Sequence, residues 1–102
     1  MVSHTLRPSA TILVVDDLQP VRELLCDVLQ TAGYTVLVAT TGSEALEVSQ
    51  RHGGKIDLLL TDLEMPDMNS LDLTEKLMRI HYRMRVLYML GDRTMLDPAI
   101  GG

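Results

Sequence analysis

The stretch Thr11-Ile12-Leu13-Val14-Val15-Asp16-Asp17 decides the fold of this chain. Its first five residues are apolar or β-branched without alternation, which is typical of a strand buried on both faces of a parallel sheet. A second run of this kind, residues 56–61, also ends on an acid, Asp62. The two runs predict two buried strands that each deliver carboxylates to the same edge of one sheet.

Strand and helix patterns alternate outward from these runs. Short apolar runs predict further strands over 35–39 and 85–90. Helical spacing predicts helices over 19–32 and 41–51, and a third that begins at Asn69 or Ser70. Strands separated by single helices form right-handed crossovers, which predicts a parallel sheet with helices on both faces.

The apolar positions also predict which side of each helix is buried. The inner face of the third helix is expected to be Leu73, Leu77 and Ile80. In the first helix the apolar residues share one broad stripe: Val21, Leu24, Leu25, Val28, Leu29 and Ala32.

Length and composition restrict the class of protein. The 102 residues predict a short linker or leader over 1–9 and one small domain over 10–102. Fourteen acids against nine bases give a net charge of −5, which argues against a nucleic-acid partner. No apolar run approaches the roughly 20 residues of a membrane span, and the first ten residues lack a secretion signal. Cys26 is the single cysteine, so we expect a cytoplasmic domain without a membrane partner.

Three aspartates form the strongest candidate site. Ligands of open α/β sheets bind beyond the carboxyl ends of the strands, where Asp16, Asp17 and Asp62 are expected to converge. Such a cluster is costly unless a cation compensates it, and Mg²⁺ prefers carboxylate oxygens. A carboxylate beside Mg²⁺ can attack a phosphoryl donor. The alternative is that these acids only end strands and cap helices.

Three segments resemble one family in order and spacing. ILVVDD (12–17), TGSEALE (41–47) and LLLTDLEMPDMNSLDL (58–73) look like the receiver domain of two-component response regulators, and like the receivers of hybrid sensor histidine kinases in particular. The resemblance implies an α/β, flavodoxin-like doubly wound parallel sheet. Because it runs only to about residue 91, we expect truncation to four strands in the order 2-1-3-4, without the fifth strand and last helix.

The resemblance also implies roles for individual residues. Asp62 matches the phosphoacceptor, and Asp17 and its neighbour Asp16 match the acidic ligands of Mg²⁺. The backbone carbonyl of Glu64 matches the group that completes the metal shell. The implied phosphodonor is a histidine kinase or a phosphotransfer domain, and the implied reaction is acceptance of one phosphoryl group rather than enzymatic turnover.

Two departures predict that switching is impaired. Leu90 stands where the family carries a Ser or Thr, and leucine has no hydroxyl to offer a phosphoryl oxygen. The family's lysine has no match, because Lys55 and Lys76 both precede the fourth strand. Thr94 and Arg93 are the nearest substitutes in sequence.

Two alternatives remain open at this point. A degenerate receiver could act as an interaction module that forms a homodimer or a domain-swapped oligomer through its apolar fourth strand. An aspartate-nucleophile phosphatase of the haloacid dehalogenase type also uses Mg²⁺, but that family carries its acids as D-x-D, whereas Asp16 and Asp17 are adjacent.

Overall fold

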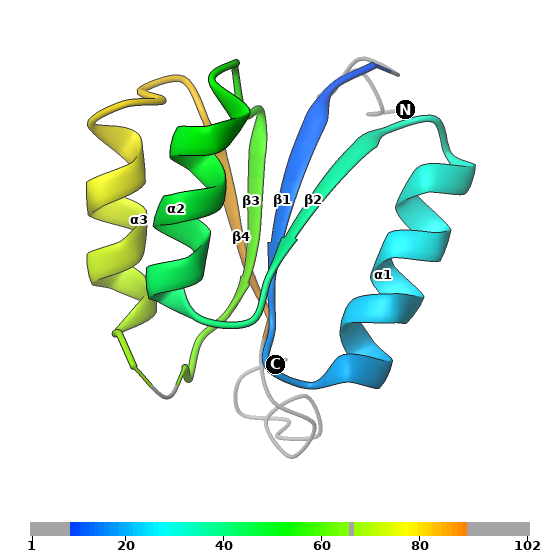
Figure 1. Ribbon diagram of the computed structural model, residues 1–102, viewed down its shortest axis with the longest axis horizontal. Coiled ribbons are helices and arrows are strands. Elements are labelled where there is room, and N and C mark those ends of the chain that lie inside the picture. The colour runs from blue at the N-terminus through cyan, green and yellow to red at the C-terminus, as the bar shows by residue number, and fades with distance from the viewer. Residues whose placement is uncertain (1–8, 66, 90–102) are drawn as a thin grey trace, which may run out of the picture.

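Strands and helices alternate strictly over the residues that the computed structural model describes, 9–65 and 67–89. The strands are β1 (Thr11–Val15), β2 (Thr35–Ala39), β3 (Leu58–Asp62) and β4 (Arg85–Met89). The helices are α1 (Gln19–Thr31), α2 (Gly42–His52) and α3 (Ser70–Met78), as Figure 1 shows. Each predicted element is present, with ends shifted by one or two residues.

All three strand pairings are parallel, in the order β2-β1-β3-β4. Val15 is the register partner of both Ala39 in β2 and Thr61 in β3, so these three strands end within one residue of one another. The predicted α/β class and strand order are confirmed. The expectations for the 1–9 linker, for Leu90 and for the residues after it concern positions 1–8 and 90–102, which lie outside the described residues.

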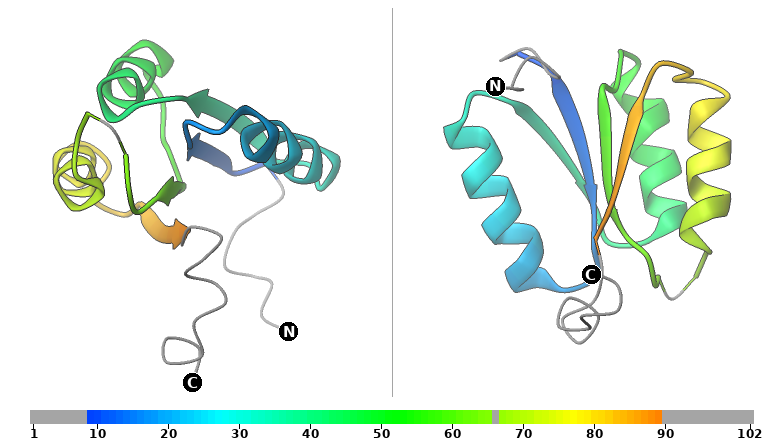
Figure 2. Two further views of the ribbon diagram at one scale, coloured as in Figure 1. Left: turned by 90° about the horizontal axis from the view of Figure 1, so that it is seen from below. Right: turned by 180° about the vertical axis from the view of Figure 1, so that it is seen from behind.

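The sheet is covered by helices on both faces, as predicted. Figure 2 shows α1 against one face and α2 with α3 against the other. The larger group of buried side chains lies under α2 and α3 and includes Leu13, Leu59 and Leu73. A smaller group, Ile12, Val14 and Leu60, lies under α1. In the described part of the chain, no helix has the length and apolar character needed to span a membrane.

Three large apolar residues that were predicted to be buried are exposed instead. Leu24 and Val28 of α1 are 62% and 55% exposed, because the sheet covers only the side of the helix that carries Leu25 and Leu29. Ile80 is 57% exposed, because α3 ends at Met78 and the chain has already left the helical path. Leu73 and Leu77 are fully buried, as predicted.

Asp67 holds the loop that follows β3 against the start of α2. Its carboxylate accepts hydrogen bonds from the backbone N–H groups of Gly42 and Ser43, both at 3.0 Å, and from the Ser43 hydroxyl at 2.7 Å. Negative charge is favourable at a helix N-terminus, where backbone N–H groups lack partners within the helix. Asp67 therefore caps α2 from a distant part of the chain.

This cap predicts a pH dependence of stability. The hydrogen bonds from Ser43 and Gly42 lower the pKa of Asp67, so the unfolded chain binds a proton at a higher pH than the folded chain does. The stabilisation is therefore complete at neutral pH and is lost as pH falls below about 3.9, the ordinary aspartate value. We expect Asp67→Ala to unfold at lower urea concentration than the parent at neutral pH, with a gap that closes in acid.

Asp27→Ala is the matched control, since it removes an exposed carboxylate in the middle of α1. A gap between Asp67→Ala and the parent that stays constant from neutral pH into acid would contradict the linkage.

Candidate functional site

Asp16, Asp17 and Asp62 converge at the carboxyl edge of the sheet, the lower edge in Figure 1. Each offers a carboxylate oxygen, and these three oxygens all lie within 4.8 Å of one another. Asp16 and Asp17 leave the end of β1, and Asp62 is the last residue of β3. The neighbouring strands bring together the three acids that the sequence singled out.

Asp16 is the innermost of the three carboxylates. Its residue is 4% exposed, and its Oδ1 accepts a hydrogen bond from the Leu18 N–H at 2.8 Å. Burial raises the pKa of Asp16, and the nearby charges of Asp62 and Asp17 add to this effect, against the lowering effect of the Leu18 hydrogen bond. The charged form of this group is therefore costly in the free protein.

The side chain of Arg22, which the sequence analysis did not single out, holds the β1–α1 turn in place. The Arg22 guanidinium donates a hydrogen bond from Nη1 to the backbone carbonyl of Asp16 at 2.9 Å. A signal for it exists in the sequence, since Arg22 lies on the first turn of the helix that follows the two aspartates. Arg22 holds the turn without neutralising the acidic cluster through a direct ion pair.

Asp62 is half-buried at the end of β3. Its Oδ1 accepts a hydrogen bond from the Glu64 N–H at 3.2 Å, which orients the carboxylate. The next residue, Leu63, donates its N–H to the Met89 carbonyl at 3.1 Å, so the loop leaves the sheet beside the end of β4. Among the described residues, the acidic cluster contains the three aspartates and not the carboxylate of Glu64.

A second polar group fixes the β2–α2 connection at the same edge. The Glu44 carboxylate accepts hydrogen bonds from the N–H and the hydroxyl of Thr40, and these bonds lower the pKa of Glu44. The Thr41 hydroxyl in turn accepts from the Glu44 N–H at 3.1 Å. This is a capping box in which the glutamate reaches one residue further back than usual. The sequence marked a helix start here but not the bond to Thr40.

The three carboxylates fit a hard divalent cation. They supply oxygen donors alone, they lie close enough to share one ion, and their mutual repulsion would be relieved by it. Mg²⁺ takes one or two carboxylates and keeps several waters, which leaves positions for a phosphoryl oxygen. Among the described residues, this cluster contains no histidine that could serve as a general acid or base. The arrangement therefore suits phosphoryl transfer better than acid–base hydrolysis.

Comparisons with known proteins agree with this geometry. A profile of the response regulator receiver domain matches residues 12–98. Sensor kinase CckA of Brucella abortus is 37% identical over 83 residues, which are 81% of this chain and 9% of CckA. Chemotaxis protein CheY of Thermotoga maritima is 34% identical over 92 residues, covering 87% of this chain and 75% of CheY. The chain therefore spans most of CheY and a small part of CckA.

Solved structures show the same fold. Response regulator protein TrrA of Thermotoga maritima, in complex with Mg²⁺ and BeF, has a TM-score of 0.68 and 33% identity over 79% of this chain and 69% of its own. TrrA has also been solved in complex with the histidine kinase ThkA. On the profile match, the relatives and the parallel sheet with its acidic edge, this chain belongs to the response regulator receiver domain family.

Proposed function

We propose that this domain accepts a phosphoryl group on Asp62 from a histidine kinase or a phosphotransfer domain. The single observation that carries the proposal is the convergence of Asp16, Asp17 and Asp62 within 4.8 Å at the carboxyl edge of the sheet. The family membership and the solved complex of TrrA with a histidine kinase support the choice of donor. We also propose that the reaction takes place in the cytoplasm.

Asp62 is the nucleophile in this proposal. One of its carboxylate oxygens attacks the phosphorus of a phosphohistidine, the new O–P bond forms as the N–P bond breaks, and the partner's imidazole leaves. The Glu64 N–H donates a hydrogen bond to Oδ1 of Asp62 and so keeps this carboxylate in one orientation. The product is an aspartyl phosphate, so the domain is an acceptor and not a turnover enzyme.

Asp16, Asp17, Asp62 and the backbone carbonyl of Glu64 would hold Mg²⁺. When bound, the ion supplies positive charge that offsets the charge on the transferring phosphoryl oxygens. Asp16 is already desolvated and fixed by the Leu18 N–H, which lowers the reorganisation needed to bind a cation. We expect transfer with weak switching afterwards, since Leu90 has no hydroxyl to offer a phosphoryl oxygen.

A second candidate function is self-association through β4. In the described sheet, β4 has a strand partner on one side only, β3. Leu87 on this strand is 56% exposed, although it lies in the middle of an apolar run. An apolar edge strand recruits further strands, so a second copy pairing along β4 gives a homodimer, directly or by exchange of an element.

Loss of a metal ligand tests the cation site. We expect Asp17→Asn to weaken Mg²⁺ binding by at least about tenfold in isothermal titration calorimetry, because one oxygen donor with a full charge is removed. Asp27→Asn makes the same charge change on the exposed side of α1 and should bind Mg²⁺ like the parent. Equal affinities for all three proteins would remove the cluster as the Mg²⁺ site.

Phosphoryl acceptance is tested by intact mass after brief incubation with Mg²⁺ and acetyl phosphate. We expect the parent to gain one phosphoryl group and Asp62→Asn to gain none, because an amide oxygen is a poor nucleophile. Asp72→Asn, on the exposed surface of α3, is the control and should be modified like the parent. A folded parent that gains no mass would leave the domain as an interaction module.

Self-association is tested by light scattering during size-exclusion chromatography. We expect the parent to dimerise with rising concentration and Leu87→Lys to remain monomeric, because an edge lysine blocks further strand pairing. Leu71→Lys places the same charge on an exposed leucine of α3 and should dimerise like the parent. A parent that is monomeric at every concentration, with or without Mg²⁺, contradicts this function.

A further inference from the structure

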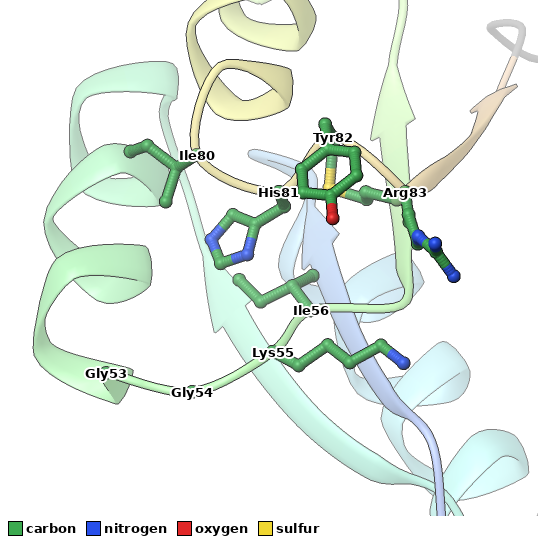
Figure 3. Close-up of a pocket in the computed structure, with 9 residues that line it drawn as sticks. Gly53, Gly54, Lys55, Ile56, Ile80, His81, Tyr82 and Arg83 are labelled. Atoms are coloured by element: carbon green, nitrogen blue, oxygen red, sulfur yellow. The ribbon is translucent and has the colours of Figure 1, made fainter.

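A hollow lies at the edge of the sheet opposite the acidic cluster. It has a volume of about 500 Å³ and is lined by two loops, 53–56 before β3 and 80–84 before β4. We call it the amino-edge groove, because it lies where these strands begin. Figure 3 shows both loops and the side chains that they contribute. Its volume lies in the range of ordinary ligand sites.

The amino-edge groove has an apolar floor and an apolar rim. Ile56 and Met84 form buried parts of its lining, 1% and 4% exposed. Ile80 and Tyr82 stand at the rim and are 57% and 74% exposed. Large exposed apolar side chains around a hollow are typical of a surface that receives a side chain of a partner protein.

The charges of the groove have one sign. Lys55 and Arg83 line it, and no aspartate or glutamate does, in a chain whose acids outnumber its bases by five. In Figure 3 both cationic side chains extend toward the same side of the groove, away from Ile80 and His81. The Arg83 guanidinium lies 5.8 Å from the centre of the Tyr82 ring, which keeps it beside the apolar rim.

Neither cation is held by a strong internal partner. Lys55 Nζ lies 3.4 Å from Asp57 Oδ1, but the lysine side chain is 61% exposed, and exposed pairs of this kind contribute little. Asp57 also accepts a hydrogen bond from the Thr11 N–H at 2.8 Å, so its carboxylate is shared with the backbone. Among the described residues, Arg83 makes no ion pair. Both cations can therefore turn to an external anion.

One wall of the groove is fixed in place. The His81 ring Nε2 lies 2.9 Å from the Ser49 hydroxyl of α2, across the boundary between α2 and the loop before β4. Ser49 is buried, so this hydrogen bond anchors the 80–84 loop to the body of the domain. A prearranged wall lowers the ordering cost of binding.

We propose that the amino-edge groove binds an acidic segment of a partner protein that carries an apolar side chain. Charge complementarity supports this occupant: carboxylates of the segment meet Lys55 and Arg83, and its apolar side chain enters the hollow over Ile56 and Met84. The groove lies at the opposite edge of the sheet from Asp62, so such a partner can bind without covering the phosphoacceptor.

The observations favour this occupant over two others. A nucleic acid would meet a chain of net charge −5 and a groove with two cations, too few to track a phosphate backbone. A membrane surface is broad and would leave the concave, apolar floor unfilled. An apolar side chain of a peptide fills the hollow over this floor. The carboxylates of the same peptide then lie within reach of Lys55 and Arg83.

The test uses the full chain and a fluorescein-labelled synthetic peptide of alternating glutamate and leucine, followed by fluorescence anisotropy. We expect binding that weakens with salt and that falls about tenfold in the Lys55→Ala/Arg83→Ala double variant, because two charge-assisted contacts are lost. Tyr82→Ser should weaken binding while leaving its salt dependence unchanged, since it removes apolar contact and no charge.

The charge-matched control is Arg51→Ala/Lys76→Ala, which removes two exposed cations outside the groove. Equal loss in both double variants would show a response to net charge alone and would overturn the proposal. Binding of phosphatidylserine vesicles through Lys55 and Arg83, without binding of the peptide, would also overturn it. Asp62→Asn should bind the peptide like the parent, which keeps this result separate from phosphoryl acceptance.

Discussion

Val15 and Thr61 are register partners in the parallel pairing of β1 with β3, so the residues that follow them lie at neighbouring positions on the carboxyl edge of the sheet. This pairing brings Asp16 and Asp17 to the carboxylate of Asp62, although more than 40 residues separate them in the chain. A shift of one residue in the register would turn every side chain of β1 to the other face of the sheet. Because Leu13 and Ile12 fill cores on opposite faces, the packing of the sheet fixes the register and thereby the site.

The acidic cluster works against the stability of the domain. Burial and two neighbouring negative charges raise the pKa of Asp16, which means that the ionised cluster is disfavoured in the folded chain. The surrounding bonds offset this cost only in part: the Leu18 N–H donates to the Asp16 carboxylate, and Arg22 donates to the Asp16 backbone carbonyl. The site is thus held in a geometry that a cation would relieve, and a binding site commonly carries such a cost.

The two edges and the two faces of the sheet differ in chemistry. The carboxyl edge gathers aspartates, while the amino-edge groove presents Lys55 and Arg83. The face under α2 and α3 has the larger core, and on the face under α1 Leu87 of β4 is 56% exposed. Among the described elements α1 alone packs on this face, and one helix is too narrow to cover four strands, so apolar surface of β4 is left exposed there. These differences give a small domain three separate surfaces with which to meet other molecules.

The sequence by itself determined the order of elements, the parallel sheet and the identity of the three aspartates, because periodicity and strand-end acids are local signals. Tertiary structure decided what local pattern cannot express. Leu24 belongs to the apolar stripe of α1 by its spacing, yet it is exposed in the folded domain. Ile80 continues the helical spacing of α3, although the helix has already ended. Asp67 capping α2 and Arg22 holding the Asp16 carbonyl depend on loops that meet only after folding. The amino-edge groove has the same origin: Lys55 and Arg83 come from two connections that β3 and β4, paired side by side, place at one edge.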